Sequence, residues 1–416
     1  MRTYRELVED LFSRHPSVQG SGFSTGAYKP GLDGMRAFDA HLGLPWKAYP
    51  CVLVAGTNGK GSVSSMLCSA FAAKGLRTAL YTSPHLSDFR ERMKVLGPDG
   101  RLLMPSEDWV AAFLLSNSSA MEGLSFFEIT TGMAFQWFRE QGVEMAIIEV
   151  GLGGRLDSTN IISPVLSIIT SIGLDHCALL GDTRAKIAAE KAGIFRSGVP
   201  ALVSSRDAET LPVFERIASD LGVPLYFADG VDGGSLLQRL DLKGPCQKEN
   251  LRTVLKALEL LCPGESVPEE AIATTAARTG LRGRWETLQT SPETIADIAH
   301  NPPALKLNFR RLEQMGRPLF IVFGIMADKD LESVSALLPA SARYYLAAPA
   351  TLRSLAAGEL EKRLALLRPD LDCRSFASVA DAVKQAVADA ARTKNALVYI
   401  GGSAFVVSEA LQLFAR

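Results

Sequence analysis

A lysine and a serine in a glycine-rich segment carry the strongest chemical signal of this chain. The apolar residues 52–54 predict a buried strand, and the segment GTNGKGS, residues 56–62, follows it directly. Beyond it, apolar residues recur at the spacing of an amphipathic helix. Glycines let backbone N–H groups approach an anion, a helix N-terminus is electropositive, and Lys60 adds a cation. The segment therefore predicts a site for the phosphates of a nucleoside triphosphate.

This segment departs from the standard phosphate-binding loop. The standard pattern has Ser or Thr directly after Gly-Lys and another glycine five residues before the Gly-Lys glycine. Here Gly61 stands between Lys60 and Ser62, and Val54 occupies the earlier position. The alternative interpretation is a glycine-rich connector of an ordinary α/β fold, but the strand before it and the helix after it favour the phosphate site.

Three further predicted strands end in polar residues. Ser83 follows the strand in RTALYTSPH, Glu149 stands near the end of MAIIEV, and His176 follows PVLSIITSIGLD. Ligands bind at the carboxyl ends of parallel strands, so we expect these side chains on the rim that holds the phosphate loop. Oxygen ligands and bound phosphates suit Mg²⁺, and a carboxylate at the place of Glu149 is typical of nucleotide-using α/β proteins.

Each of these residues also has an interpretation without function. Ser83 precedes a proline, and a serine there is more often a turn residue. His176 alone is more often a satisfied turn histidine than a ligand. Glu149 is harder to dismiss, because a buried carboxylate must be paired or bound to metal. Their joint placement at strand ends favours a shared magnesium site.

A second polar cluster stands further along the chain. The segment TIADIAHNPPA places Asp297, His300 and Asn301 at the end of a predicted strand. A few residues earlier, LRGRWE carries Arg284. An arginine there could contact nucleotide phosphates, because its guanidinium group forms bidentate bonds to them. The alternative is a surface arginine at a linker.

The elements that must position these residues alternate between strand and helix along the chain, which predicts α/β architecture. The stretch ETLQTSPET, residues 286–294, is polar, contains a proline and interrupts the alternation. We therefore place a domain boundary and a hinge there. We expect a phosphate-loop, ATP-binding domain with a mostly parallel sheet in residues 1–288, and a smaller Rossmann-like α/β domain in residues 294–416.

Composition excludes several classes of protein. The 416 residues, 47% of them hydrophobic, are enough for a large core and favour two or more domains. A net charge of −1 gives no basic field for nucleic acid, and no apolar run approaches the roughly 18 residues of a membrane span. MRTYRELVEDLF lacks the apolar core of a signal peptide, and the six cysteines form no CxxC pair. We expect a cytoplasmic protein without zinc.

Taken together, the motifs of the chain resemble those of one family. The motifs are AGTNGKGS, YTSPHLSDFRER, SFFEITT, EVGLGGRLDSTN, ITSIGLDHCALLGDT, EKAGIF, GRWE, ADIAHNP and FGIMADKD. They are similar, in order, to the signatures of folylpolyglutamate synthase/dihydrofolate synthase, which belongs to the Mur ligase superfamily of ATP-dependent amide-forming ligases. The phosphate loop and HNP are shared across the superfamily, whereas TSPHL and EVGLGGRLDSTN point to the folate branch. The resemblance runs from about residue 20 to GGSAFVVSE near the end of the chain.

The resemblance implies binding roles for individual residues. It implies that ATP contacts Asn58, Gly59, Lys60, Gly61, Ser62, Asn250, Arg284 and Asp297. It implies that Mg²⁺, as one or two ions, is bound by Ser83, Glu149 and His176. It also implies that dihydropteroate contacts Ser125, Phe126, Phe127, Glu128, Leu156, Asp157 and Ser158.

Three residues are implied as catalytic, namely Lys60, Lys191 and His300. Lys191, in EKAGI, matches a lysine that carries a carbamate in this family, and a carbamate is an anion that can ligate metal. Without the resemblance, Lys191 reads as a helix-surface lysine. His300 matches a histidine near the transferred phosphate or the incoming glutamate.

The sequence departs from the family pattern at three places. Cys177 stands where LDHT is usual, Cys246 precedes the Gln247-x-x-Asn250 spacing where an aromatic residue or histidine is common, and ADIAHNP replaces DGAHNP. No implied ligand is lost. The adenine pocket and the glutamate site are less well defined by the sequence as a result.

The implied activity is ATP-dependent ligation of L-glutamate to dihydropteroate and to tetrahydrofolate through an acyl phosphate. Because an acyl phosphate hydrolyses in water, we expect domain closure about the hinge. We expect a monomer whose partners are small molecules: ATP, L-glutamate, and dihydropteroate or a reduced folate. The alternatives are one of the two ligations alone, a Mur-type ligase for another carboxylate, a nucleotide hydrolase or kinase, and an inactive binding protein.

Overall fold

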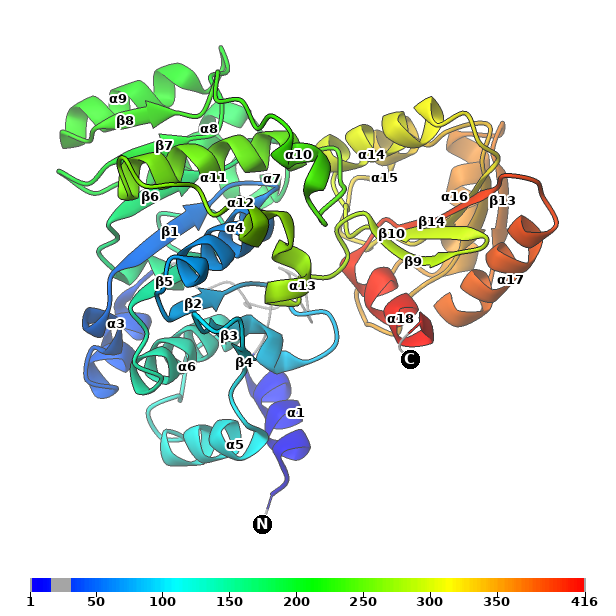
Figure 1. The fold of residues 1–416 in the computed structure, drawn as a ribbon. Helices are drawn as coiled ribbons and strands as arrows, with labels where there is room; N and C mark the ends of the chain where they lie inside the picture. Colours follow the sequence, from blue (N-terminus) through cyan, green and yellow to red (C-terminus); the bar gives the residue numbers. More distant parts are fainter. Residues whose placement is uncertain (1, 16–30, 415–416) are drawn as a thin grey trace. The chain divides into compact units, whose positions relative to one another are not determined.

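The computed structural model describes residues 2–15 and 31–414 and divides the chain into two compact units. The N-terminal unit comprises Met1–Asp241 and Gln247–Leu281, and the C-terminal unit comprises Leu242–Cys246 and Arg282–Arg416. The predicted ranges 1–288 and 294–416 include residues 1, 16–30 and 415–416, which lie outside the described residues. Figure 1 shows each unit as one sheet flanked by helices.

The N-terminal unit is built on an eight-stranded sheet in the order β4-β3-β2-β5-β1-β6-β7-β8. Neighbouring strands from β2 to β8 run parallel, and β3 and β4 add an antiparallel edge. The strands are β1 (Cys51–Ala55), β2 (Thr78–Tyr81), β3 (Met93–Leu96), β4 (Leu102–Leu103), β5 (Met145–Glu149), β6 (Leu166–Ile169), β7 (Ala201–Val203) and β8 (Leu225–Phe227). The predicted mostly parallel sheet is therefore confirmed.

The described α-helices of this unit are α1 (Tyr4–Arg14), α3 (Asp33–His41), α4 (Lys60–Ala73), α5 (Glu107–Ser116), α6 (Phe126–Glu140), α7 (Cys177–Leu180), α8 (Arg184–Ala192), α9 (Leu211–Leu221), α10 (Leu236–Arg239), α11 (Gln247–Leu261), α12 (Glu269–Ala273) and α13 (Thr275–Thr279). Three short 3₁₀ helices are η1 (Pro45–Ala48), η2 (Phe89–Arg92) and η3 (Ser158–Ile161). The helix α4 packs against β2 and β5 and also against α11, α12 and α13. It is therefore buried almost all round, which its run of small and apolar residues permits.

The C-terminal unit has a six-stranded sheet in the order β13-β12-β11-β14-β10-β9. All neighbouring pairs are parallel except β9 and β10. The strands are β9 (Glu286–Thr290), β10 (Glu293–Ala296), β11 (Leu319–Phe323), β12 (Arg343–Leu346), β13 (Asp372–Ser375) and β14 (Leu397–Gly401). The helices are α14 (Pro302–Gln314), α15 (Leu331–Ser335), α16 (Ala357–Leu367), α17 (Val379–Ala391) and α18 (Ala404–Phe414). This is the predicted Rossmann-like α/β architecture.

The predicted domain boundary over residues 286–294 is wrong. These residues form the antiparallel hairpin β9–β10, which extends the C-terminal sheet through the parallel pairing of β10 with β14. The units divide between Leu281 and Arg282 instead. Polar composition and a proline misled the prediction, because an edge hairpin needs few apolar residues and tolerates proline in its turn.

Candidate functional site

The phosphate loop lies at the centre of the N-terminal sheet. β1 pairs with β5 so that Val54 lies beside Glu149, and with β6 so that Ala55 lies beside Ile169. The polar residues that follow β1, β5 and β6 consequently leave the sheet at one edge. The strand β2 adds Ser83 to the same edge, since its Tyr81 lies beside Ile148 of β5. The predicted gathering of strand ends is confirmed for these elements.

Hydrogen bonds to the turn after β6 fix the conformation of the loop. The Thr57 N–H donates to the Ser171 carbonyl at 2.7 Å, and the Asn58 N–H donates to the Ser171 hydroxyl at 3.0 Å. The Thr170 hydroxyl donates to the Asn58 carbonyl at 2.8 Å. The loop is therefore held in shape by its neighbour in the sheet before any ligand arrives.

Gly59 is required by both backbone conformation and space. Its φ is +92°, in the left-handed region that favours glycine, and it caps the N-terminus of α4. A Cβ atom here would lie 2.3 Å from Oδ1 of Asn250. The first turn of α11 thus presses against the phosphate loop, and this contact joins segments that are far apart in the sequence.

Gln247 is a residue of this site whose role the sequence did not reveal. Its side chain is 2% exposed, accepts from Nδ2 of Asn250 at 3.0 Å and donates to the Ser62 hydroxyl at 3.4 Å. Gln247 and Asn250 are three residues apart on α11 and so lie on one helix face. The glutamine–asparagine spacing ahead of a helical pattern was a signal for this contact, but the sequence could not identify its partner.

Lys60 and Lys191 both donate to the carbonyl oxygen of Gly56, at 3.0 and 2.8 Å. Lys191 lies on α8 and is 4% exposed, so it is not the surface lysine that its local pattern indicates. Burial and the nearby charge of Lys60 lower the pKa of Lys191 from 10.5 to about 7. A large share of Lys191 is therefore a neutral amine near neutral pH.

Ser83 and Glu149 lie together at the ends of neighbouring strands. The Ser83 N–H donates to Oε2 of Glu149 at 3.1 Å, and the Glu149 side chain is 4% exposed. A buried carboxylate oxygen, a hydroxyl and a nearby phosphate loop form a donor set that suits a hard cation such as Mg²⁺. The residues present therefore fit the metal that the resemblance implies.

His176 lies on the turn after β6, with a φ of +54°. Its N–H donates to Oδ1 of Asp175 at 2.9 Å, and its ring Nε2 lies 3.7 Å from Oδ2 of the same carboxylate. The Asp175 carboxylate thus lies beside the imidazole, at a distance longer than that of a hydrogen bond. Within residues 2–15 and 31–414, no group of three or more His, Cys, Asp and Glu side chains has the arrangement of a metal site.

The residues implied for dihydropteroate separate into buried and accessible ones. Ser125 and Glu128 form a capping box at the start of α6, and the buried Phe126 stacks on Phe12 with ring centroids 4.5 Å apart. These contacts give all three a structural role. Phe127 is only partly buried, and its ring lies where a side chain at Gly151 would be.

The second implied segment, residues 156–158, shows the same division. Asp157 is buried and accepts from the backbone N–H groups of Leu152 and Thr159, at 2.9 and 3.0 Å. It thereby fixes the turn after β5 and caps η3. Leu156 and Ser158 on either side of it are partly exposed. The accessible members of the implied set are therefore Phe127, Leu156 and Ser158, together with the half-buried Ser125.

In the C-terminal unit, Asp297 is a buried anchor. Its Oδ2 accepts from the Trp285 N–H at 2.8 Å, and its Oδ1 accepts from the Ala299 N–H at 2.9 Å and from Nδ2 of Asn308 at 2.8 Å. Burial raises the pKa of Asp297, while these bonds and the charge of Arg284 oppose the rise. Protein groups thus occupy three of its roughly four acceptor positions.

Arg284 and His300 flank this anchor along the chain. The Arg284 guanidinium is partly exposed and donates to the carbonyl of Arg282 at 3.3 Å. The His300 ring is also partly exposed, and its Nδ1 lies 3.1 Å from the Ile298 carbonyl. Both side chains are accessible to a ligand of this unit.

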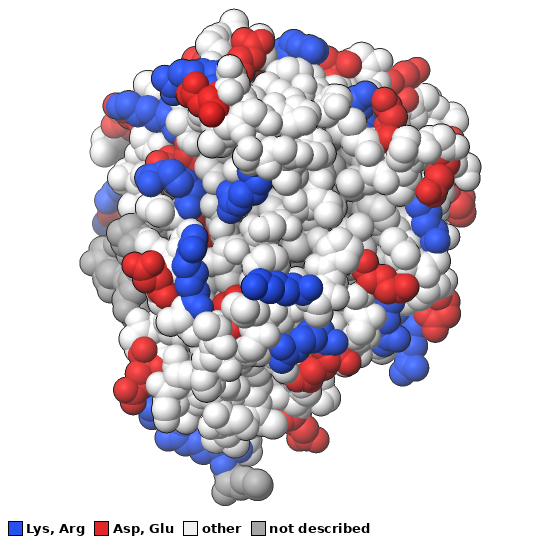
Figure 2. Space-filling view, turned by 90° about the vertical axis from the view of Figure 1, so that its left-hand side faces the viewer, with Lys and Arg blue, Asp and Glu red and all other residues white. Residues whose placement is uncertain are grey.

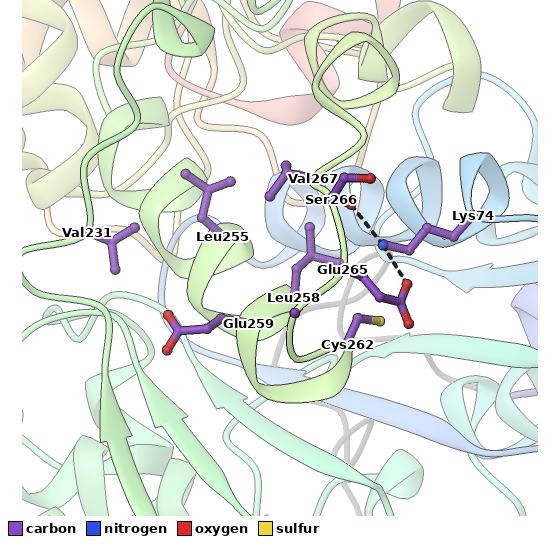
Figure 3. A pocket seen from close by; sticks show the side chains of 10 residues that line it. Lys74, Val231, Leu255, Leu258, Glu259, Cys262, Glu265, Ser266 and Val267 are labelled. Atoms are coloured by element: carbon purple, nitrogen blue, oxygen red, sulfur yellow. Dashed lines mark hydrogen bonds and ion pairs between the residues drawn. The ribbon is translucent and has the colours of Figure 1, made fainter.

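A pocket of about 300 Å³ lies elsewhere in the N-terminal unit (Figure 3). It lies at the C-terminal ends of α4 and α11, where Lys74 donates to the Glu265 carboxylate at 2.8 Å and to the Ser266 carbonyl at 2.9 Å. None of the predicted site residues lines it. Both helices begin at the phosphate loop, so this pocket lies at their opposite ends.

One face of the molecule shows no dominant charge. Acidic and basic side chains are interspersed on the face drawn in Figure 2, in keeping with a net charge of −1. No helix within residues 2–15 and 31–414 combines the length and the hydropathy needed to cross a membrane.

Two family models match most of the chain. Residues 54–228 match the Mur ligase middle domain, and residues 283–404 match the Mur ligase, glutamate ligase domain. The first range contains the phosphate loop, Ser83, Glu149, His176 and Lys191. The second contains Arg284, Asp297 and His300.

Curated relatives extend this similarity to nearly the full chain. An Escherichia coli (strain K12) protein called dihydrofolate synthase/folylpolyglutamate synthase is 34% identical over 387 residues, which cover 88% of each chain. A Haloferax volcanii protein called probable bifunctional folylpolyglutamate synthase/dihydropteroate synthase is 34% identical over 340 residues. That alignment covers 75% of this chain but only 40% of the longer relative.

Solved structures share the fold of the whole chain. The structure of "E.coli FolC in complex with DHPP and ADP" has a TM-score of 0.82 and 31% identity, and the match covers 99% of this chain and 97% of that one. A bifunctional folylpolyglutamate synthase/dihydrofolate synthase with Mn, AMPPNP and L-glutamate bound has a TM-score of 0.82 and 29% identity, covering 99% and 98% of the two chains.

Proposed function

This chain belongs to the dihydrofolate synthase/folylpolyglutamate synthase family of Mur ligases and is an ATP-dependent ligase, and from this premise we propose that it joins L-glutamate both to dihydropteroate and to a reduced folate. The observation that carries the proposal is the meeting of a phosphate loop and the buried carboxylate of Glu149 at one sheet edge. A ligase that activates a carboxylate with ATP needs both features.

The nucleotide is assigned to residues of the described loop. The backbone N–H groups of residues 58–62, at the N-terminus of α4, favour bound phosphate. Lys60 lies in the same loop and can exchange its bonds to loop carbonyls for bonds to phosphate. Asn250 is assigned to the same nucleotide. Arg284 and Asp297 of the C-terminal unit are assigned as further residues of the nucleotide site. Asp297 acts chiefly by holding the backbone next to Arg284, because it accepts from the Trp285 N–H.

Ser83, Glu149 and His176 would hold one or two Mg²⁺ ions. When bound, the metal supplies positive charge to the phosphates of ATP. The chain prepares this site before the metal arrives, because the Ser83 N–H fixes the Glu149 carboxylate and the Asp175 carboxylate lies beside the His176 ring. Manganese in the relative's structure supports a divalent cation here.

Lys191 is proposed to carry a carbamate. Its neutral amine attacks CO₂, a C–N bond forms as one C–O π bond breaks, and one proton leaves to solvent, so a neutral site becomes anionic. The lowered pKa and the burial of Lys191 support this reaction, because only the unprotonated amine is nucleophilic. The carbamate would replace the bond of Lys191 to the Gly56 carbonyl.

The reaction has two steps. An oxygen of the substrate carboxylate attacks the γ-phosphorus of ATP, the bond to the β–γ bridging oxygen breaks, and ADP leaves. The amine of L-glutamate then attacks the acyl carbon, phosphate is expelled, and the amine loses a proton. Lys60 offsets the charge on the transferred phosphoryl group. His300 is assigned as the acceptor of the amine proton, and its accessible ring supports this role.

The test is glutamate-dependent ADP release with Mg²⁺-ATP, with products weighed by mass spectrometry. Dihydropteroate and tetrahydrofolate are offered separately, and Lys60→Met serves as the control for contaminating ATPase. A mass gain of one glutamate on both substrates is expected. Gain on only one would reduce the activity to a single ligation, and ADP release without any amide would overturn the ligase assignment for these substrates.

A further inference from the structure

Asn308 is a polar residue at a core position of α14. The buried face of this helix carries Leu305, Asn308, Phe309 and Leu312, which is the i, i+3, i+4, i+7 spacing of residues that face a core. Asn308 is 4% exposed. An amide at such a position is unfavourable unless its hydrogen-bonding groups are satisfied, so its presence requires a local reason.

The amide of Asn308 is directed at Asp297. Its Nδ2 donates to Oδ1 of Asp297 at 2.8 Å and to the hydroxyl oxygen of Tyr399 at 3.0 Å, so both of its N–H groups have acceptors. Tyr399 is completely buried, and the Asp297 side chain is buried as well. Three polar side chains therefore form one network inside the apolar core of the C-terminal unit, and such networks hold a single geometry when they are satisfied.

Asp297 also holds the backbone of the segment that contains Arg284. Its other oxygen, Oδ2, accepts from the Trp285 N–H at 2.8 Å. Trp285 has a φ of +53°, a left-handed conformation that is exceptional for a bulky residue. Its ring is covered by the Arg311 guanidinium, 4.4 Å from the ring centroid. Such a conformation persists only where its surroundings impose it, and here the Asp297 carboxylate and Arg311 do so.

We propose that Asn308 is a positioning residue for the nucleotide contact of Arg284. It fixes the Asp297 carboxylate, the carboxylate fixes the backbone of Trp285, and that backbone sets the direction in which the neighbouring Arg284 side chain leaves the chain. Asn308 itself touches no ligand. The inference rests on the proposed function, because it takes Arg284 to bind the nucleotide.

The experiment compares Asn308→Leu, Arg284→Ala and the double variant in the full chain. Asn308→Leu keeps the approximate volume and removes both donors. AMPPNP is titrated into each protein, and the Kd of dihydropteroate, which is assigned to the N-terminal unit, is measured in parallel. The matched control is Tyr344→Phe, which removes a buried hydrogen bond of 2.8 Å to the Pro339 carbonyl in the same sheet.

We expect Asn308→Leu to raise the Kd of AMPPNP about tenfold and to leave the Kd of dihydropteroate unchanged. The double variant should bind AMPPNP no more weakly than Arg284→Ala, because both changes remove the same interaction, the contact of Arg284 with the nucleotide. Tyr344→Phe should lower the Tm without weakening AMPPNP binding. The comparison with Tyr344→Phe thereby separates a specific loss of nucleotide binding from a general loss of stability.

Three outcomes would overturn the inference: unchanged AMPPNP binding in Asn308→Leu, additive losses in the double variant, or an equal loss of affinity in Tyr344→Phe. Each of these leaves the proposed function standing, provided that Arg284→Ala is impaired. If Arg284→Ala binds AMPPNP normally, the nucleotide role assigned to Arg284 fails, and the inference fails with it.

Discussion

Lys60 and Lys191 converge on a single acceptor, the carbonyl oxygen of Gly56. Lys191 is buried, and its ammonium form is also repelled by that of Lys60 on the same oxygen. The pKa of Lys191 falls to about 7 as a result. The fold thus keeps part of Lys191 as an unprotonated amine beside the phosphate loop near neutral pH.

Removal of CO₂ is expected to reduce turnover. In degassed, bicarbonate-free buffer the ligase activity should fall severalfold and return when bicarbonate is added, because the neutral amine of Lys191 recombines with CO₂. Initial rates of ADP release measure this effect. Lys186→Met, on the same helix but exposed, is the control and should respond to bicarbonate like the parent protein. Activity that ignores bicarbonate would contradict a functional carbamate.

The lowered pKa of Lys191 also predicts that the stability of the protein depends on pH. Its pKa is 10.5 when unfolded and about 7 when folded, so between these values the unfolded chain binds more protons and the free energy of unfolding rises with pH. The burial penalty is complete below pH 7 and vanishes near pH 10.5. Lys191→Met should therefore stabilise the protein in CO₂-free buffer by about 2–4 kcal/mol at pH 7. Urea unfolding at pH 7 and pH 9 measures this gain, which must shrink at the higher pH.

The features that the sequence could not predict are contacts between residues that are far apart in the sequence. The strands and the placement of polar residues at their ends follow local patterns, and these predictions were confirmed. The contact of Gly59 with Asn250 and the burial of Lys191 depend on how α11 and α8 pack, which no local pattern records. The hairpin β9–β10 was mistaken for a domain boundary, because the partner that makes it part of a sheet is β14, about 100 residues later.

Gly59→Ala is expected to abolish tight nucleotide binding. The new Cβ would lie 2.3 Å from Oδ1 of Asn250, so either the loop or the first turn of α11 must move. Gly75→Ala is the matched control: its φ of +96° imposes similar backbone strain, but nothing lies within 4 Å of its Cβ. Both variants should lose about 1–2 kcal/mol of stability through backbone strain, and the clash with Asn250 adds to this loss in Gly59→Ala. Calorimetric titration with ADP should show weakened binding in Gly59→Ala alone, and equal binding by both variants would contradict this reading of the loop.

Glu149→Gln is expected to raise the Mg²⁺ concentration needed for half-maximal activity by about tenfold or more, because a neutral amide is a weak ligand for a hard cation. The amide oxygen can still accept from the Ser83 N–H, so the fold should persist. Glu144→Gln is the control, since Glu144 accepts from the Arg77 N–H at 2.9 Å just before the start of the same strand, β5. Activity is titrated against Mg²⁺ for both variants. If Glu149→Gln needed the same Mg²⁺ concentration as the parent protein, Glu149 would not be a metal ligand.

A disulfide across the hairpin β9–β10 should leave turnover intact. Thr290 and Glu293 lie opposite each other next to the turn, so Thr290→Cys with Glu293→Cys can form a cross-strand disulfide. If residues 286–294 were the hinge, the crosslink would block its motion and abolish the ligase reaction. Because these residues already form a paired hairpin, we expect equal rates for the oxidised and reduced forms of the same protein. The reduced form also controls for loss of the Glu293–Arg317 ion pair. If oxidation abolished activity and a reductant restored it, residues 286–294 would act as a hinge after all.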